Sequence, residues 1–61
     1  MNIKFSSSTG AYIEYGQSID DIINRFSGNG NTVTYFTHGE GDDLTYHVYI
    51  NDQLFGWAHI I

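Results

Sequence analysis

The stretch that decides the fold is LTYHVYI, residues 44–50, in which two sets of side chains alternate. Successive side chains of a β-strand point to opposite faces of a sheet, so this period of two predicts a strand with one buried face. One face carries Leu44, Tyr46, Val48 and Ile50, and the other carries Thr45, His47 and Tyr49. The chain is therefore expected to build a sheet around this strand.

Two further strands are predicted on either side of it. Residues 32–37 are rich in threonine, valine and aromatics, and residues 54–61 form another apolar run. A glycine-rich acidic segment, residues 38–43, and the pair Asn51-Asp52 separate these runs, and both are typical of hairpin connections. The C-terminal half is therefore predicted to be a three-stranded antiparallel meander.

One amphipathic helix is predicted before the meander. Its apolar residues recur at i, i+3, i+4 and i+7: Ile19, Ile22, Ile23 and Phe26. Ser18 is expected to be the N-cap, with Asp21 completing a variant capping box. Arg25 is expected to pair with Asp21 one turn earlier, and Gly28 to end the helix in a left-handed conformation.

The N-terminal region offers two shorter strand candidates, residues 2–5 and residues 11–15, joined by a serine-rich loop. Whether both pair with the main sheet is left open by the sequence.

The predicted class is α+β, with an antiparallel sheet of four or five strands in the order ββαβββ and one amphipathic helix packed on one face. Residues 1–61 are expected to form a single compact domain, because so short a chain supports one core.

The register of the last hairpin decides which aromatic side chains are buried. A two-residue loop at Asn51-Asp52 pairs Ile50 with Gln53. The predicted core face then holds Val33, Tyr35, Leu44, Tyr46, Val48, Ile50, Phe55, Trp57 and Ile61. The opposite face then holds Thr34, Phe36, Thr45, His47, Tyr49, Leu54, Gly56 and Ala58. A three-residue loop would instead bury Gly56, Ala58 and Ile60 and expose Phe55, Trp57 and His59. We prefer the first register, because it buries the only tryptophan and leaves small residues outside.

Charge restricts the partners of this chain. Two basic residues, Lys4 and Arg25, stand against seven carboxylates, and the net charge is −5. A surface with so few cations repels nucleic-acid phosphates and anionic membranes, and favours basic protein grooves. No apolar run reaches the roughly 18 residues of a membrane span. No signal peptide is recognised at residues 1–5, so a cytoplasmic protein is expected.

No catalytic or metal-binding pattern stands out. The absence of cysteine excludes disulfides and thiolate metal sites. In the preferred register His47 and His59 face opposite sides, and His38 lies at a hairpin end, so the histidines do not converge as metal ligands must. The acidic segment, residues 39–43, lacks the ligand spacing of a calcium loop. We therefore expect no enzyme activity, no cofactor and no metal.

The acidic residues are predicted to gather at one end of the domain. The start of the helix and residues 39–43 should lie at the same end, because the intervening strand runs antiparallel to the helix. This acidic pole would contain Asp20, Asp21, Glu40, Asp42 and Asp43, with Asp52 at the other end. The alternative is that acids favour helix starts and turns for local reasons alone.

The expected function is a non-enzymatic protein-binding module. The predicted partner-binding residues are Asp20, Asp21, Glu40, Asp42, Asp43, Phe36, His47 and Tyr49, facing a basic protein surface. In size, charge and composition, without any shared motif, the chain resembles phage-encoded inhibitors of host nucleases and defence systems, including antirestriction and anti-CRISPR proteins. That resemblance implies a nucleic-acid-handling protein as the partner. The alternative is a homodimer formed through the exposed sheet face, an edge strand or the C-terminal strand.

Overall fold

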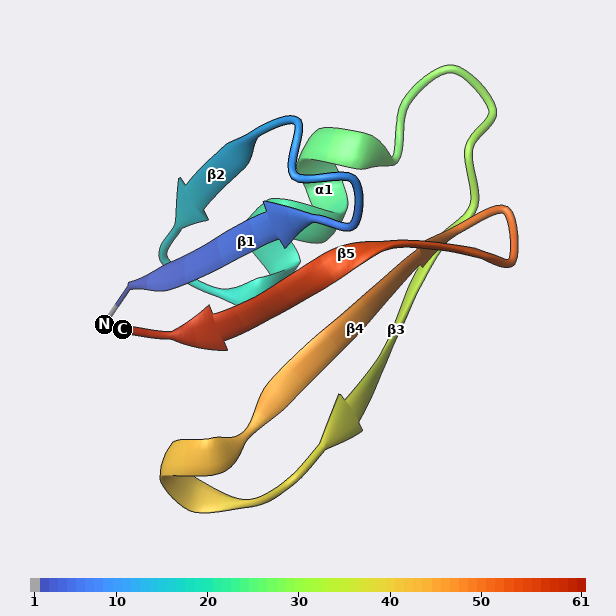
Figure 1. Cartoon of the computed structure of the whole chain (residues 1–61). Helices are drawn as coiled ribbons and strands as arrows, with labels where there is room; N and C mark the ends of the chain where they lie inside the picture. The colour runs from blue at the N-terminus through green and yellow to red at the C-terminus, as the bar shows by residue number, and fades with distance from the viewer. Residues whose placement is uncertain (1) are drawn as a thin grey trace.

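A computed structural model describes residues 2–61 as a five-stranded antiparallel sheet with one α-helix. The elements are β1 (Ile3–Ser7), β2 (Ile13–Gly16), α1 (Ile19–Phe26), β3 (Val33–His38), the short 3₁₀ helix η1 (Gly41–Asp43), β4 (Thr45–Ile50) and β5 (Gln53–Ile60). The order ββαβββ confirms the predicted fold class. The helix covers the half of the sheet that contains β1 and β2, whereas the far ends of β3 and β4 extend beyond it (Figure 1).

Both N-terminal segments belong to the sheet, whose strand order is β2-β1-β5-β4-β3. β1 pairs with β2 on one side and with β5 on the other. The C-terminal strand β5 is therefore paired along both edges, and the expectation that it could serve as an exposed seam is wrong. The free edges of the sheet are those of β2 and β3. The N–H of Ile61 donates to the carbonyl of Asn2 at 2.9 Å, which holds the two ends of the chain side by side (Figure 1).

The β4–β5 turn has the predicted two-residue form. Asn51 and Asp52 both have positive φ values, 52° and 69°, and Ile50 faces Gln53 across the turn. Two consecutive left-handed residues characterise the tight hairpin turns whose twist matches that of the flanking strands. Asparagine and aspartate tolerate this conformation better than other side chains do.

A β-bulge at Phe55 changes the register immediately after this turn. Tyr49 pairs with Leu54, but Val48 pairs with Gly56, so Phe55 is the extra residue on β5. One extra residue exchanges the two faces of the strand beyond it. The predicted pairings of Val48 with Phe55 and of Tyr46 with Trp57 are therefore wrong.

The bulge reverses the burial predicted for the end of the chain. Ala58 is fully buried and Gly56 is buried as well, whereas Trp57 is 36% exposed and Ile61 is 57% exposed. The prediction was therefore wrong at four positions: it buried Trp57 and Ile61, and it exposed Gly56 and Ala58. The physical reason is that the core side of β5 lies against the Phe5 ring, where only a small residue fits.

The core sits between the helix and the middle of the sheet. Its buried members are Ile3, Phe5, Ile22, Val48 and Ala58, and half-buried residues around them are Ile19, Ile23, Phe26, Val33, Tyr46 and Phe55. Phe5 is at the centre, with its ring centroid 5.3 Å from that of Phe26 and 5.5 Å from that of Phe55. The predicted helix stripe thus does face the sheet, and Phe55 is in the core as expected.

The start of α1 differs in detail from the predicted capping box. Ser18 is the N-cap, but its side chain makes no capping hydrogen bond. Instead, the Asp21 carboxylate accepts the backbone N–H of Gln17 at 2.7 Å. Arg25 pairs with Glu14 of β2 at 3.0 Å, so the expected pair with Asp21 is wrong. This ion pair ties the helix to the edge strand.

The end of α1 also differs from the prediction. The helix ends at Phe26 with Ser27 as its C-cap, and the Ser27 hydroxyl donates to the carbonyl of Ile23. The left-handed residues of the following loop are Asn29 and Gly30, with φ values of 56° and 80°. The expectation that Gly28 would take this conformation is wrong.

Candidate functional site

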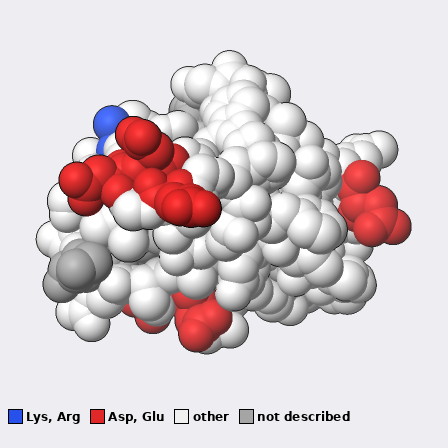
Figure 2. All heavy atoms as spheres, turned by 90° about the horizontal axis from the view of Figure 1, so that it is seen from below, with Lys and Arg blue, Asp and Glu red and all other residues white. Residues whose placement is uncertain are grey.

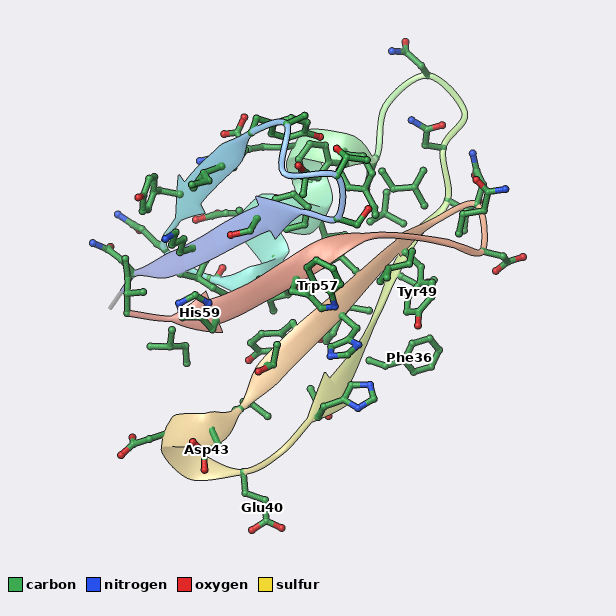
Figure 3. The ribbon with its side chains drawn as sticks, viewed as in Figure 1. Phe36, Glu40, Asp43, Tyr49, Trp57 and His59 are labelled. Atoms are coloured by element: carbon green, nitrogen blue, oxygen red, sulfur yellow. The ribbon has the colours of Figure 1, made fainter. Side chains whose placement is uncertain are left out.

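The face of the sheet that does not contact α1 is uncovered, and we call it the open sheet face. The register of the strands brings together on it Lys4, Ser6, Ile13, Tyr15, Thr34, Phe36, His38, Thr45, His47, Tyr49, Leu54, Trp57 and His59. All five strands contribute to this face, so its side chains are held by a continuous hydrogen-bonded sheet. Phe36, Tyr49, Trp57 and His59, from three neighbouring strands, are labelled on it in Figure 3.

Large side chains on the open sheet face are unusually exposed. Phe36 is 60% exposed, Tyr15 56% and Ile13 52%. Scattered apolar residues are normal on a protein surface, whereas several large exposed side chains on one sheet face, here among threonines, histidines and Lys4, are typical of an interaction site. The open sheet face is therefore the candidate functional site.

Ring contacts hold several of these side chains in place. The imidazoles of His38 and His47 stack with centroids 3.8 Å apart, and the His47 ring meets Trp57 edge-on at 6.5 Å. The rings of Phe36 and Tyr49 also meet edge-on, at 5.6 Å. Edge-on contacts such as those of Phe36 with Tyr49 and of His47 with Trp57 are a preferred geometry of aromatic pairs and favour fixed ring positions. Little side-chain entropy is then lost when a partner binds.

The histidines lie on one face, contrary to expectation. His47 and His59 were predicted on opposite faces, but the bulge at Phe55 brings both to the open sheet face. The pKa of His47 is lowered, mainly by its partial burial and to a smaller extent by the charge of the neighbouring His38. This shift favours the neutral imidazole, whose ring offers one hydrogen-bond donor and one acceptor. Within residues 2–61, no group of three or more histidine, cysteine or acidic side chains could hold a metal ion.

The predicted acidic pole is divided into two parts. One shallow hollow is lined by Ser18, Ile19 and Ile60, and another by Asp42 and Ile60. The start of α1 and the η1 turn therefore lie at the same end of the molecule, on either side of an apolar residue. Seen from below, the carboxylates form separate groups instead of one continuous patch (Figure 2).

The two acidic groups lie on different sides of the sheet. Glu40, Asp42 and Asp43 are exposed at the tip of the β3–β4 hairpin, at one end of the open sheet face (Figure 3). Asp20 and Asp21 belong to α1 and so lie on the other side of the sheet. The structure therefore brings Phe36, His47 and Tyr49 together with the η1 carboxylates, and it separates them from Asp20 and Asp21.

The prediction missed several residues of the site. Trp57 and His59 were assigned to the wrong side of β5, and Ile13 and Tyr15 were left unassigned because the pairing of β2 was open. A signal was available in Gly56, because an isolated glycine within a strand often marks a bulge or a close approach of another chain segment.

A third hollow, between α1 and the β4–β5 turn, contains polar side chains that serve the fold. It is lined by Asn31 and Asn51, among other residues. The Asn51 amide oxygen accepts the N–H of Thr32 at 2.9 Å, and its amide nitrogen donates to the Asn31 side chain at 3.2 Å. These amides join the loop before β3 to the β4–β5 turn, so their bonding capacity is largely used within the chain.

Comparisons with protein-family models, with curated proteins and with solved structures give no match to this chain. No helix among residues 2–61 combines the length and the apolar character that crossing a membrane requires.

Proposed function

We propose that this chain is a non-enzymatic protein-binding module that docks its open sheet face onto a basic surface of a partner protein. The observation that carries this proposal is the uncovered row of aromatic side chains across β3, β4 and β5. A partner that covers Phe36, Tyr49 and Trp57 removes apolar area from water, which is the main favourable term in protein association. Aromatic side chains of this kind supply most of the binding energy at protein interfaces.

The charge of the surroundings favours a protein over a nucleic acid. Aromatic sheet faces also bind single-stranded nucleic acids, but those sites add cations that track the phosphates. Among residues 2–61, the open sheet face offers one lysine or arginine, Lys4, and the face ends at Glu40, Asp42 and Asp43. A basic protein surface matches this arrangement. We infer a nucleic-acid-handling protein as the partner class, and inhibition as the effect, because covering a basic surface denies it to phosphates.

The first test replaces the two most exposed large side chains of the open sheet face. The variant Phe36→Thr with Tyr15→Thr keeps strand-forming residues and is expected to lose at least about tenfold in affinity for the partner. Partners are captured from a lysate of the source organism, and binding to the purified partner is then measured by calorimetry. Tyr35→Thr is the matched control, because Tyr35 is 41% exposed on the opposite face of the same strand. Equal binding by the double variant and the control would refute the proposed face.

The second test addresses the η1 carboxylates. Reversing two charges, in Asp42→Lys with Asp43→Lys, is expected to slow association more than it changes dissociation, because exposed charges steer the encounter. Affinity of the unmodified chain should also fall as salt rises, through screening. Asp20→Lys on α1 is the control and is expected to have a smaller effect. Salt-independent binding, unchanged by the double reversal, would show that the partner surface is not basic.

A further inference from the structure

The edge of β3 has no protection against pairing. Its six residues, Val33–His38, pair with β4 without a bulge, and all but Val33 are exposed. Most proteins protect such an edge with a lysine, a proline, a bulge or a very short strand. β3 carries none of these. The other free edge, β2, is shorter, with four residues, and carries the charged Glu14.

The free backbone groups of β3 can be identified from the ladder. The N–H of Asn51 donates to the carbonyl of Thr32 at 2.8 Å, and hydrogen-bonded pairs alternate along an antiparallel ladder. Thr34, Phe36 and His38 therefore direct their backbone groups to β4. Val33, Tyr35 and Thr37 direct their N–H and C=O groups outward, where no strand of this chain pairs with them.

Charge makes this edge suited to a second copy of the same chain. Residues 26–39 contain no lysine, arginine, aspartate or glutamate, although the chain as a whole has a net charge of −5. An antiparallel second copy centred on Tyr35 would place Glu40 level with the other copy's Gly30, in an uncharged loop. The acidic η1 turns of the two copies are thereby kept apart, so electrostatic repulsion does not oppose self-pairing along β3.

We propose that two copies pair through β3 about a twofold axis at Tyr35, forming one continuous ten-stranded sheet. Tyr35 then faces its own copy, and Val33 faces Thr37, so every outward group of these three residues has a partner. A one-residue shift would set outward groups against inward ones. An axis at Phe36 would set Val33 against Gly39, whose φ of 83° departs from strand geometry. The register with its axis at Tyr35 therefore gives hydrogen-bond partners to the outward N–H and C=O groups of β3.

This pairing would merge the two open sheet faces on the same side of the extended sheet, because the twofold axis is perpendicular to it. The pairing goes beyond the proposed function and does not depend on it, since the open sheet face remains uncovered. A single pair of six-residue strands forms a small interface. We therefore expect a weak dimer, with a dissociation constant on the order of 10 μM to 1 mM.

The test uses sedimentation equilibrium of the full chain over a wide concentration range. The unmodified chain should approach twice its monomer mass at high concentration. Tyr35→Pro removes one outward N–H, a change that edge strands tolerate, and should raise the dissociation constant at least about tenfold. Tyr35→Thr retains the N–H and should change it less than about fivefold. Circular dichroism confirms that each variant is folded. A chain that stays monomeric throughout, or a folded Tyr35→Pro variant that dimerises equally well, would overturn the proposal.

The register is tested separately with single cysteines, because the native chain has none. Thr34 faces Phe36 of the other copy in a non-hydrogen-bonded pair, where Cα atoms lie about 4.5 Å apart, within disulfide range. Mixing Thr34→Cys with Phe36→Cys under mild oxidation should therefore give mainly the mixed disulfide. A statistical mixture of the three disulfide species would overturn this register. Loss of partner binding in Phe36→Thr with an intact dimer would separate this proposal from the proposed function.

Discussion

Gly56 lies against the ring of Phe5 so closely that a Cβ atom at position 56 would stand 2.5 Å from the Phe5 Cζ. The same Cβ would also meet the carbonyl oxygen of Ser6 on the neighbouring strand. Phe5 is fully buried and makes ring contacts with Phe26 and Phe55, so it has no space into which to move. The bulge and the core are therefore mutually dependent.

Replacing Gly56 by alanine is expected to destabilise the chain by about 1–3 kcal/mol or more, because the added methyl group overpacks the core and meets a backbone carbonyl. Urea denaturation followed by far-ultraviolet circular dichroism measures this. Gly28→Ala is the matched control, because a Cβ at Gly28 meets nothing within 4 Å and its φ is not positive. That variant should be neutral or slightly stabilising. Equal effects of the two substitutions would contradict the packing of Gly56 on Phe5.

The open sheet face and the core should respond differently to the loss of an aromatic ring. Phe36→Thr removes a ring that is 60% exposed, and should change the free energy of unfolding by about 0.5 kcal/mol or less. Phe5→Ala removes a fully buried ring and should cost about 3–5 kcal/mol, enough to unfold a chain of this size. Thermal unfolding of both variants provides the comparison. A large cost at Phe36 would mean that the open sheet face is part of the core.

Asn51 is expected to contribute to stability through both its conformation and its side chain. Asn51→Gly keeps the positive φ but loses the hydrogen bonds to Thr32 and Asn31, and should cost about 1–2 kcal/mol. Asn51→Ala loses the same bonds and adds the strain of a left-handed alanine, so it should cost more. Denaturant midpoints of the two variants test this order. The reverse order would show that the left-handed conformation is not retained in the turn.

The lowered pKa of His47 predicts that folding stability decreases as the pH falls. Partial burial and the stacked His38 both disfavour the charged form in the folded chain. The unfolded chain therefore binds a proton more readily as the pH falls through the ordinary range of histidine, about 6.5. This contribution therefore lowers stability as the pH falls through the ordinary pKa range of histidine, and it is absent well above that range.

His38→Gln should raise the pKa of His47 towards its ordinary value and reduce the loss of stability on acidification. Nuclear magnetic resonance titration of the His47 ring measures the pKa directly. His47→Gln serves as the reference for the stability measurement. An unchanged His47 titration after removal of His38 would show that the stacked pair does not form in solution.

Local patterns in the sequence predicted most of the elements, because each depends on neighbours in the chain. The stripe from Ile19 to Phe26 predicted α1, and the alternation in residues 44–50 predicted β4 and its burial. The two-residue turn at Asn51 and Asp52 was predicted because its residue types suit left-handed backbone. These signals were sufficient for the class ββαβββ.

Long-range packing explains the errors. The bulge at Phe55 is favoured by the fit of Gly56 against Phe5, which lies 51 positions earlier in the chain, and no local pattern contains that contact. The position of β1 between β2 and β5 likewise depends on contacts between residues far apart in the chain. Since the bulge exchanges faces, one missed residue moved Trp57, Ala58 and His59 to the wrong sides. Phe36, His47 and Tyr49 were placed on the correct face of the sheet because they lie on β3 and β4, whereas the extra residue of the bulge is on β5.

The placement of Trp57 makes the molecule its own optical probe. It is the only tryptophan, and it lies partly exposed on the open sheet face against His47, outside the core. Indole emission depends on contact with water and on nearby groups, so binding at this face should alter the spectrum without any added label. The indole is already partly hydrated in the folded chain, so unfolding should change its emission less than it would change that of a fully buried indole. Fluorescence should therefore follow events at the surface, and circular dichroism those in the interior.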